Sequence, residues 1–165
     1  MPQTPAQADA FRSLARHPLK FRLFLLAKLP AAYFSGLRIT ALDEAACTVR
    51  VPFKWFTQNP FRSTYFACLS MGAELSTGAL CMAPVWKRRP AVSMLVVGCD
   101  AQFFKKATGP TFFTCADGAA ISAAIDRAEA TGEGQTITCT STGRNGAGET
   151  VAEFRFTWSF KAKKP

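Results

Sequence analysis

One acidic residue stands alone in the most apolar stretch of the chain. Between Arg62 and Lys87 the only charged residue is Glu74, and its neighbours are small or apolar. An enclosed carboxylate is costly unless something hydrogen-bonds it, and poor solvation raises its pKa. Glu74 is therefore a candidate general base or nucleophile. The alternative is a structural glutamate that is satisfied by Ser70, Ser76 or Thr77 or that reaches solvent at an edge.

A second set of polar atoms precedes this stretch. Asn59 lies in an Asn-Pro-Phe loop, and Ser63 or Thr64 can cap the helix that follows. Unpaired N–H groups at a helix N-terminus stabilise a developing oxyanion, and the Asn59 amide can add a donor. Glu74 lies ten residues beyond Thr64, which is about 15 Å along a helix. One helix cannot bring both to one carbonyl, so we expect a symmetric dimer in which Glu74 faces the partner's Asn59.

The remaining sequence predicts an α+β fold around this helix. Residues 64–82 are apolar or small nearly all round, as in a helix enclosed by other elements. Period-two alternation and turn residues predict strands before and after it. A long apolar helix with a mostly antiparallel sheet indicates a sheet wrapped around that helix. The expected elements are a strand pair within 37–53, strands at 91–104, 111–116, 134–141 and 149–161, and a helix at 118–130 capped by Asp117.

The N-terminal region has a different pattern. Residues 1–8 are expected to be disordered, and residues 9–29 carry Phe and Leu at helical spacing between basic residues. Pro18 should divide that stretch into two short helices. We expect residues 1–30 to form a helical leader packed on the core, and residues 31–165 to form the main domain. A membrane-surface role for the basic leader is the alternative.

Composition and charge argue against several classes of protein. The net charge is +9, which favours anionic partners, but the basic residues are scattered and no nucleic-acid-binding signature is present. Six well-separated cysteines and the single His17 make no zinc motif, and there is no Gly-rich phosphate loop, so we expect neither metal nor cofactor. Cysteines in apolar stretches and the lack of a signal-peptide pattern favour a cytoplasmic protein. The lack of a long uncharged apolar run argues against stable membrane insertion.

Two motifs within this frame resemble a known family. Asn59–Ala67 (NPFRSTYFA) and Ala73–Gly78 (AELSTG) are similar to the hotdog-fold thioesterase superfamily, in particular to its PaaI-like branch. The resemblance extends over about residues 29–161 to a bacterial subfamily of thioesterase-like hotdog domains. In PaaI-like thioesterases an Asn or Gln precedes Pro-Phe, a His-Gly-Gly opens the buried helix, and a Glu or Asp follows within it. Residues 65–67 (Tyr-Phe-Ala) stand here in place of His-Gly-Gly.

The resemblance implies a hotdog fold, an acyl thioester substrate and a role for each matching residue. Glu74 would act as general base on water or attack the acyl carbon directly. Asn59 and the N–H groups near Tyr65 and Phe66 would polarise the carbonyl. Ser76 or Thr77 would hold the carboxylate or the water. The substrate would contact Phe66, Ser76 and Thr77, and its CoA phosphates would contact Lys105, Lys106 and Arg144.

Two functions are compatible with this pattern. The first is an acyl-CoA thioesterase, because Asn59 and Glu74 have the separation found in the family. The second is a non-catalytic module that binds acyl-CoA or fatty acyl groups, because Tyr65 and Phe66 occupy the His-Gly positions. The expected partners are acyl-CoA or another acyl thioester, including one on acyl carrier protein, and further copies of the chain in a homodimer or homotetramer.

Overall fold

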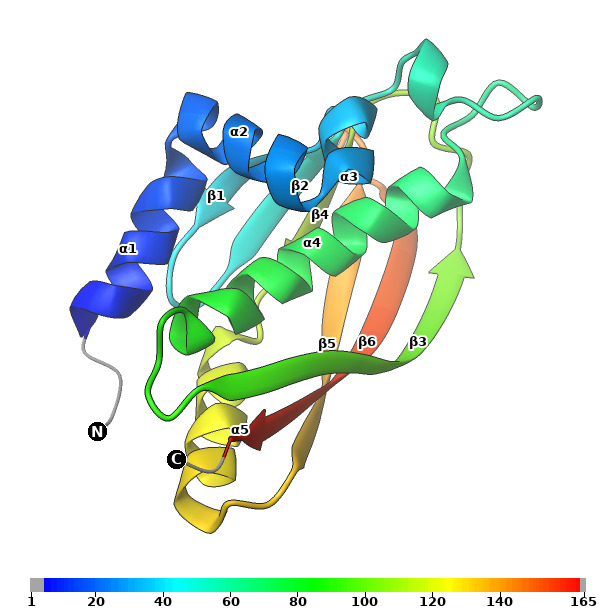
Figure 1. The fold of residues 1–165 in the computed structure, drawn as a ribbon. Helices are drawn as coiled ribbons and strands as arrows, with labels where there is room; N and C mark the ends of the chain where they lie inside the picture. The colour runs from blue at the N-terminus through cyan, green and yellow to red at the C-terminus, as the bar shows by residue number, and fades with distance from the viewer. Residues whose placement is uncertain (1–4, 164–165) are drawn as a thin grey trace.

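The computed structural model describes residues 5–163, and of residues 5–8 only the backbone. In this part of the chain three helices precede the first strand (Figure 1). They are α1 (Pro5–Arg16), α2 (Pro18–Lys28) and α3 (Pro30–Ser35).

Proline sets the boundaries of these helices. Each begins with a proline, which lacks an N–H group and fits the first helical turn. Pro18 separates α1 from α2 as predicted, and the His17 ring accepts a hydrogen bond from the Lys20 N–H at the start of α2. The expected disorder of the first eight residues is wrong for residues 5–8, which are helical, and residues 1–4 lie outside the described part.

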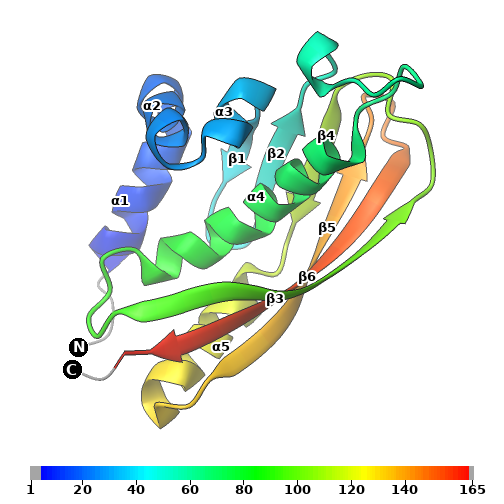
Figure 2. The ribbon, with the colours of Figure 1, turned by 45° about the vertical axis from the view of Figure 1, so that its right-hand side comes forward.

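An antiparallel sheet curves around one long helix (Figures 1 and 2). The six strands lie in the order β1-β2-β4-β5-β6-β3, so β1 and β3 form the edges. The long helix α4 (Phe66–Val85) crosses the concave face, and a single 3-10 turn, η1 (Trp55–Thr57), precedes it. The predicted strands, the enclosed helix and the α+β class are confirmed. The strands are β1 (Arg38–Leu42), β2 (Cys47–Val51), β3 (Val92–Phe103), β4 (Thr111–Cys115), β5 (Gln135–Arg144) and β6 (Thr150–Ala162).

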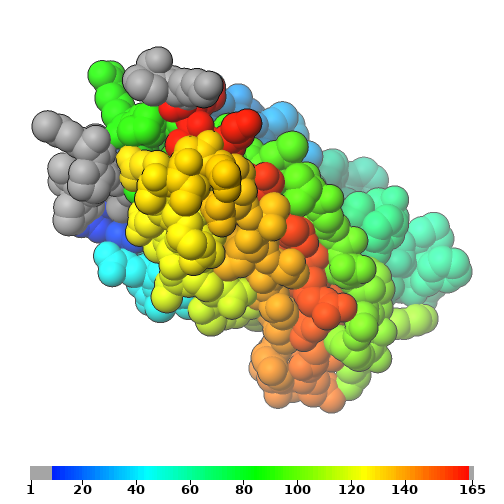
Figure 3. Space-filling view, turned by 90° about the horizontal axis from the view of Figure 1, so that it is seen from below, coloured from blue at the N-terminus to red at the C-terminus, as the bar shows by residue number. Residues whose placement is uncertain are grey.

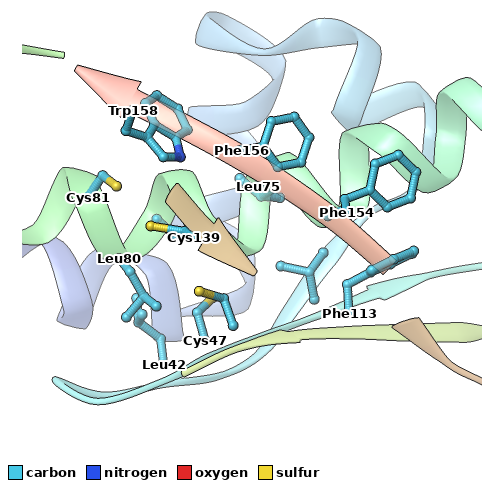
Figure 4. Close-up of a cluster of buried hydrophobic side chains, with 14 of the residues drawn as sticks. Leu42, Cys47, Leu75, Leu80, Cys81, Phe113, Cys139, Phe154, Phe156 and Trp158 are labelled. Atoms are coloured by element: carbon cyan, nitrogen blue, oxygen red, sulfur yellow. The ribbon is translucent and has the colours of Figure 1, made fainter. Parts of the chain in front are cut away.

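Helix α4 is apolar all round because protein covers most of its surface. It contacts β2, β4 and β5, and Figure 4 shows side chains such as Leu75, Phe113 and Phe154 filling the space between helix and sheet. Gly72 permits the closest approach, because an added Cβ would lie 2.2 Å from Val51 Cγ2. By length and composition α4 could cross a membrane, but 61% of that apolar window is buried within the fold. It is the core helix of the sheet.

Strand β6 forms the other side of this core. Its inward residues Phe154, Phe156, Trp158 and Phe160 are all buried, as the alternation predicted. Period-two patterning is reliable here because one face of the strand packs on α4 and the other faces solvent.

Helix α5 (Gly118–Thr131) follows β4 and covers the end of the sheet, where Figure 3 shows it on the molecular surface. Asp117 precedes it as expected but makes no cap. Its Oδ2 accepts a hydrogen bond from the Thr140 N–H (2.8 Å), which ties the helix start to β5 instead. Arg88, just after α4, donates to Asp126 (2.8 Å) and to Glu129, and so joins α5 to the end of the core helix.

Candidate functional site

Glu74 lies in the third turn of α4 and borders a cavity of about 390 Å³ between α2, α4 and β3. The lining of the cavity is apolar apart from Glu74 and Lys28. The Glu74 carboxylate has no hydrogen bond or ion pair with any described residue, and burial raises its pKa above the ordinary value. An unpaired carboxylate beside a cavity is the arrangement expected of a reactive group rather than of a satisfied structural glutamate.

Ser76 and Thr77 direct their hydroxyls to the sheet. The Ser76 hydroxyl is hydrogen-bonded to that of Ser141 (2.7 Å), and the indole Nε1 of Trp158 donates to Thr77 Oγ1 (3.0 Å). The Thr77 hydroxyl in turn donates to the backbone carbonyl of Glu74. The prediction that one of these hydroxyls holds the carboxylate is therefore wrong. Thr77 instead fixes Trp158, which forms a wall of the cavity.

Gly78 makes room for the carboxylate one turn further along α4. A Cβ added at this position would lie 3.1 Å from Glu74 Oε1 and 3.4 Å from the Trp158 ring. A larger side chain would press on both groups, so the glycine keeps the carboxylate next to open space.

The N-terminal leader supplies much of the cavity wall. The sequence predicted that the leader packs on the core, but nothing in it connected the leader with Glu74. The Phe residues at helical spacing in the leader are the only signal of this in the sequence, and they predict packing on the core without indicating a cavity. The leader residues that line the cavity are Phe11, Phe21, Phe24, Lys28 and Leu29.

Asn59 closes its own loop. Its Oδ1 accepts hydrogen bonds from the N–H groups of Phe61 (3.0 Å) and Ser63 (3.2 Å), and its Nδ2 donates to Ser63 Oγ (3.1 Å). Arg62, in the same turn, has a positive φ of 58°. The amide therefore holds the loop shape, and its bonds to Ser63 and Phe61 use the carbonyl oxygen and one of the two Nδ2 hydrogens.

No side chain caps α4. Tyr65 is the N-cap residue and makes no side-chain capping bond. Ser63 is engaged within the Asn59 loop, and the Thr64 hydroxyl donates to the carbonyl of Ala107 (3.2 Å). The predicted cap by Ser63 or Thr64 is therefore wrong, because tertiary contacts use both hydroxyls.

The uncapped end leaves backbone donors available. The Tyr65 N–H, one of the predicted donors, is used in a bond to the carbonyl of Thr57 (2.7 Å). The N–H groups of Phe66 and Ala67 have no partner among the described residues. These two groups, at the positive end of the helix dipole, are the donors that can bind an oxyanion.

The three basic candidates lie at the same end of the sheet as this loop. Lys105 lines a cavity of about 570 Å³ beside Asn59, but it pairs with Glu149 (2.6 Å), and this pair lowers the pKa of Glu149. Arg144 donates to atoms within the β5–β6 turn. Lys106 makes no side-chain hydrogen bond or ion pair with a described residue. Of the three, Lys106 is the one with its full donor capacity free.

Strand β3 shows that the two halves of the site lie apart in one chain. Met94, near its start, lines the Glu74 cavity, whereas Phe103, at its end, lines the cavity beside Asn59. Phe103 lies nine positions after Met94 in the strand, and Glu74 lies eight residues beyond Phe66 in α4, which is about 12 Å along the helix. Glu74 and the uncapped helix end of the same chain therefore lie too far apart to contact one carbonyl group.

Several solved structures, two of them described as thioesterases, share this fold. PA5026 from Pseudomonas aeruginosa, described as a "Probable Thioesterase", is 22% identical, with a TM-score of 0.75 over 88% of this chain and 97% of that chain. Thioesterase HI1161 from Haemophilus influenzae is 14% identical, with a TM-score of 0.60 over 85% and 88%. The E. coli PaaI protein from the phenylacetic acid degradation operon is 14% identical, with a TM-score of 0.60 over 92% and 96%. At such identities the likeness establishes the fold.

The architecture is therefore the hotdog fold. Residues 20–160 match the family described as "Domain of unknown function (DUF4442)", and the chain belongs to that family. Comparison with curated proteins gives no match.

Proposed function

We propose that the protein is a homodimeric acyl-thioester hydrolase, with acyl-CoA as substrate and Glu74 as general base. The observation that carries this proposal is the unpaired carboxylate beside an otherwise apolar cavity. Such a cavity suits an acyl chain, and a carboxyl group with a raised pKa is a stronger base once ionised. The thioesterases among the structural neighbours support the same class of substrate.

The dimer is proposed from the free edge of β3. This strand pairs with β6 on one side only, and its Leu95 and Val97 are 65% and 54% exposed. A long apolar edge is a template for another strand. Antiparallel pairing of two β3 strands about their midpoint places the Met94 end of one beside the Phe103 end of the other. Each Glu74 cavity would then meet the uncapped α4 of the partner.

The proposed reaction is hydrolysis by a base-activated water. Glu74 accepts a proton from water as the water oxygen attacks the thioester carbonyl carbon. The N–H groups of Phe66 and Ala67 in the partner subunit stabilise the negative charge on the carbonyl oxygen. When the carbonyl forms again, the C–S bond breaks and the thiol leaves with the proton returned by Glu74. The free Lys28 and Lys106 supply positive charge for the CoA phosphates.

Release of free thiol from short-, medium- and long-chain acyl-CoAs tests the proposal. The Glu74→Gln variant should lose turnover by about a hundredfold or more. Glu133→Gln is the matched control, since Glu133 is exposed in a loop, and it should leave turnover unchanged. No thiol release from any substrate, or equal rates for Glu74→Gln and the unmodified protein, would contradict the assignment.

A non-catalytic acyl-thioester binding module is the second candidate. It is favoured by the Phe66 ring, 57% exposed beside the helix start, and by the engagement of the Asn59 amide in its own loop. This candidate predicts saturable acyl-CoA binding in calorimetry without thiol release.

A reducing compartment such as the cytoplasm is part of the proposal. The six cysteines are all free thiols, and five of them are buried in the fold. Buried thiols in an apolar core behave as small hydrophobic residues and need no oxidising environment.

A further inference from the structure

An apolar stripe on α2 faces solvent. Leu19, Leu23 and Leu26 are 66%, 58% and 43% exposed, and their spacing of four and three residues places them on one face of the helix. The opposite face carries Phe21 and Leu25, which are buried in the core. Helix α2 therefore has two apolar faces, and no described residue covers the outer one.

Positive charge flanks this stripe. Lys20 and Arg22 lie on either side of the leucines at the helical repeat of 3.6 residues per turn, and neither makes an ion pair with a described residue. Between Asp9 and Asp43 the chain has six basic residues and no acidic one. Two copies of this face placed together would set like charges against each other, whereas an anionic surface would attract them. The charge pattern therefore disfavours a second copy of the chain as the occupant.

Exposed aromatic side chains extend the same surface. Phe34 on α3 is 55% exposed and Trp55 on η1 is 85% exposed. The Lys54 ammonium group donates to the Phe34 carbonyl (3.0 Å), which joins the η1 segment to α3. Figures 1 and 2 both show α2, α3 and η1 along one side of the molecule. Leu, Phe and Trp next to Lys are typical of protein surfaces that lie at a membrane interface.

We propose that the outer face of α2, with Leu19, Leu23 and Leu26 flanked by Lys20 and Arg22, docks on the surface of an anionic lipid bilayer. The leucines enter the headgroup region and the two basic side chains contact the anionic lipid groups. The association is peripheral, since no segment of α2 leaves the fold.

Docking would also place the candidate site near the bilayer. The inner side of α2 lines the Glu74 cavity through Phe24 and Lys28, so a docked protein holds that cavity next to a store of long acyl chains. This consequence rests on the proposed function, whereas the docking itself does not.

Vesicle flotation with the full chain tests the proposal. The probes are vesicles of phosphatidylcholine alone and vesicles enriched in phosphatidylglycerol. The unmodified protein should float with the anionic vesicles and much less with the neutral ones. The triple variant Leu19→Ser/Leu23→Ser/Leu26→Ser should reduce the bound fraction about tenfold, because it removes the inserted apolar surface. Its melting temperature should stay close to that of the unmodified protein, because all three side chains are exposed.

A pair of charge variants completes the test and does not depend on the triple variant. Lys20→Glu should also weaken binding to anionic vesicles. Lys161→Glu makes the same change in net charge at the exposed end of β6 and should bind as before.

Three outcomes would overturn the proposal. One is equal binding to neutral and anionic vesicles, and another is unchanged binding by the triple variant. In the third, the unmodified protein binds no vesicles and the triple variant forms a smaller assembly in light scattering. That result would show that another copy of the chain covers the three leucines.

Discussion

Replacing Glu74 with glutamine should stabilise the protein at neutral pH while it removes the proposed catalytic base. Burial raises the pKa of Glu74 above its ordinary value of 4.5, so the folded state holds this proton more tightly than the unfolded state. Well below pH 4.5 the carboxyl is neutral in both states. As the pH rises, the unfolded chain ionises first, and the free energy of unfolding falls until the folded carboxyl also ionises.

The size of the effect follows from the pKa shift. Each unit by which the folded pKa is raised lowers stability at neutral pH by about 1.4 kcal/mol. Glutamine has nearly the same shape and no charge, so we expect Glu74→Gln to raise the free energy of unfolding at neutral pH by on the order of 1 kcal/mol, the usual scale for relieving one unsatisfied buried polar group. The gain should vanish well below pH 4.5, where both side chains are neutral.

Urea unfolding followed by circular dichroism measures this difference, at one fixed protein concentration because subunit association adds to apparent stability. The control Glu133→Gln should change stability by less than about 0.5 kcal/mol at either pH. A less stable Glu74→Gln at neutral pH, or a difference that is the same at both pH values, would refute the conclusion that this carboxylate is unpaired.

Three further predictions concern the edge strand, the helix start and the core. Leu95→Lys/Val97→Lys places charge on the β3 edge and should give an inactive monomer in light scattering, whereas an intact dimer would exclude β3 pairing. Phe66→Pro removes one helix-start N–H, and Tyr65 already has a conformation suited to a following proline (φ −61°, ψ 133°). The Phe66→Pro variant should lower kcat about a hundredfold, whereas Phe66→Ala, which keeps the N–H, should not. Equal kcat values for the two variants would show that the N–H plays no part in the reaction. Gly72→Ala brings a Cβ to 2.2 Å from Val51 Cγ2 and should lower the free energy of unfolding by about 1–3 kcal/mol. An unchanged denaturation midpoint would contradict the close packing of α4 on β2.

The elements of the fold could be predicted from the sequence where local patterning and burial agree. The alternation in β6 and the uninterrupted apolar stretch of α4 each report directly which faces are covered. Glu74 could be singled out for the same reason, because one charge in a stretch that must be enclosed conflicts with its surroundings.

The polar partners could not be predicted, since they depend on contacts between residues far apart in the chain. Trp158 donates a hydrogen bond to Thr77, and Thr64 donates one to the Ala107 carbonyl. No local sequence pattern predicts either of these bonds. Asn59 differs, because its bonds lie within five residues, and an Asx turn was available as an interpretation. The position of Asn59 just before a helix N-terminus instead favours an interpretation as a donor to an oxyanion.

Subunit complementation tests most directly whether the site is assembled from two chains. Glu74→Gln and Phe66→Pro should each be inactive alone. When they are mixed and allowed to exchange subunits, half of the dimers become mixed dimers, in which one of two sites keeps both Glu74 and the Phe66 N–H of its partner. The mixture should therefore recover about a quarter of the unmodified activity. No recovery, after subunit exchange has been verified, would mean that the two groups do not meet across a dimer interface.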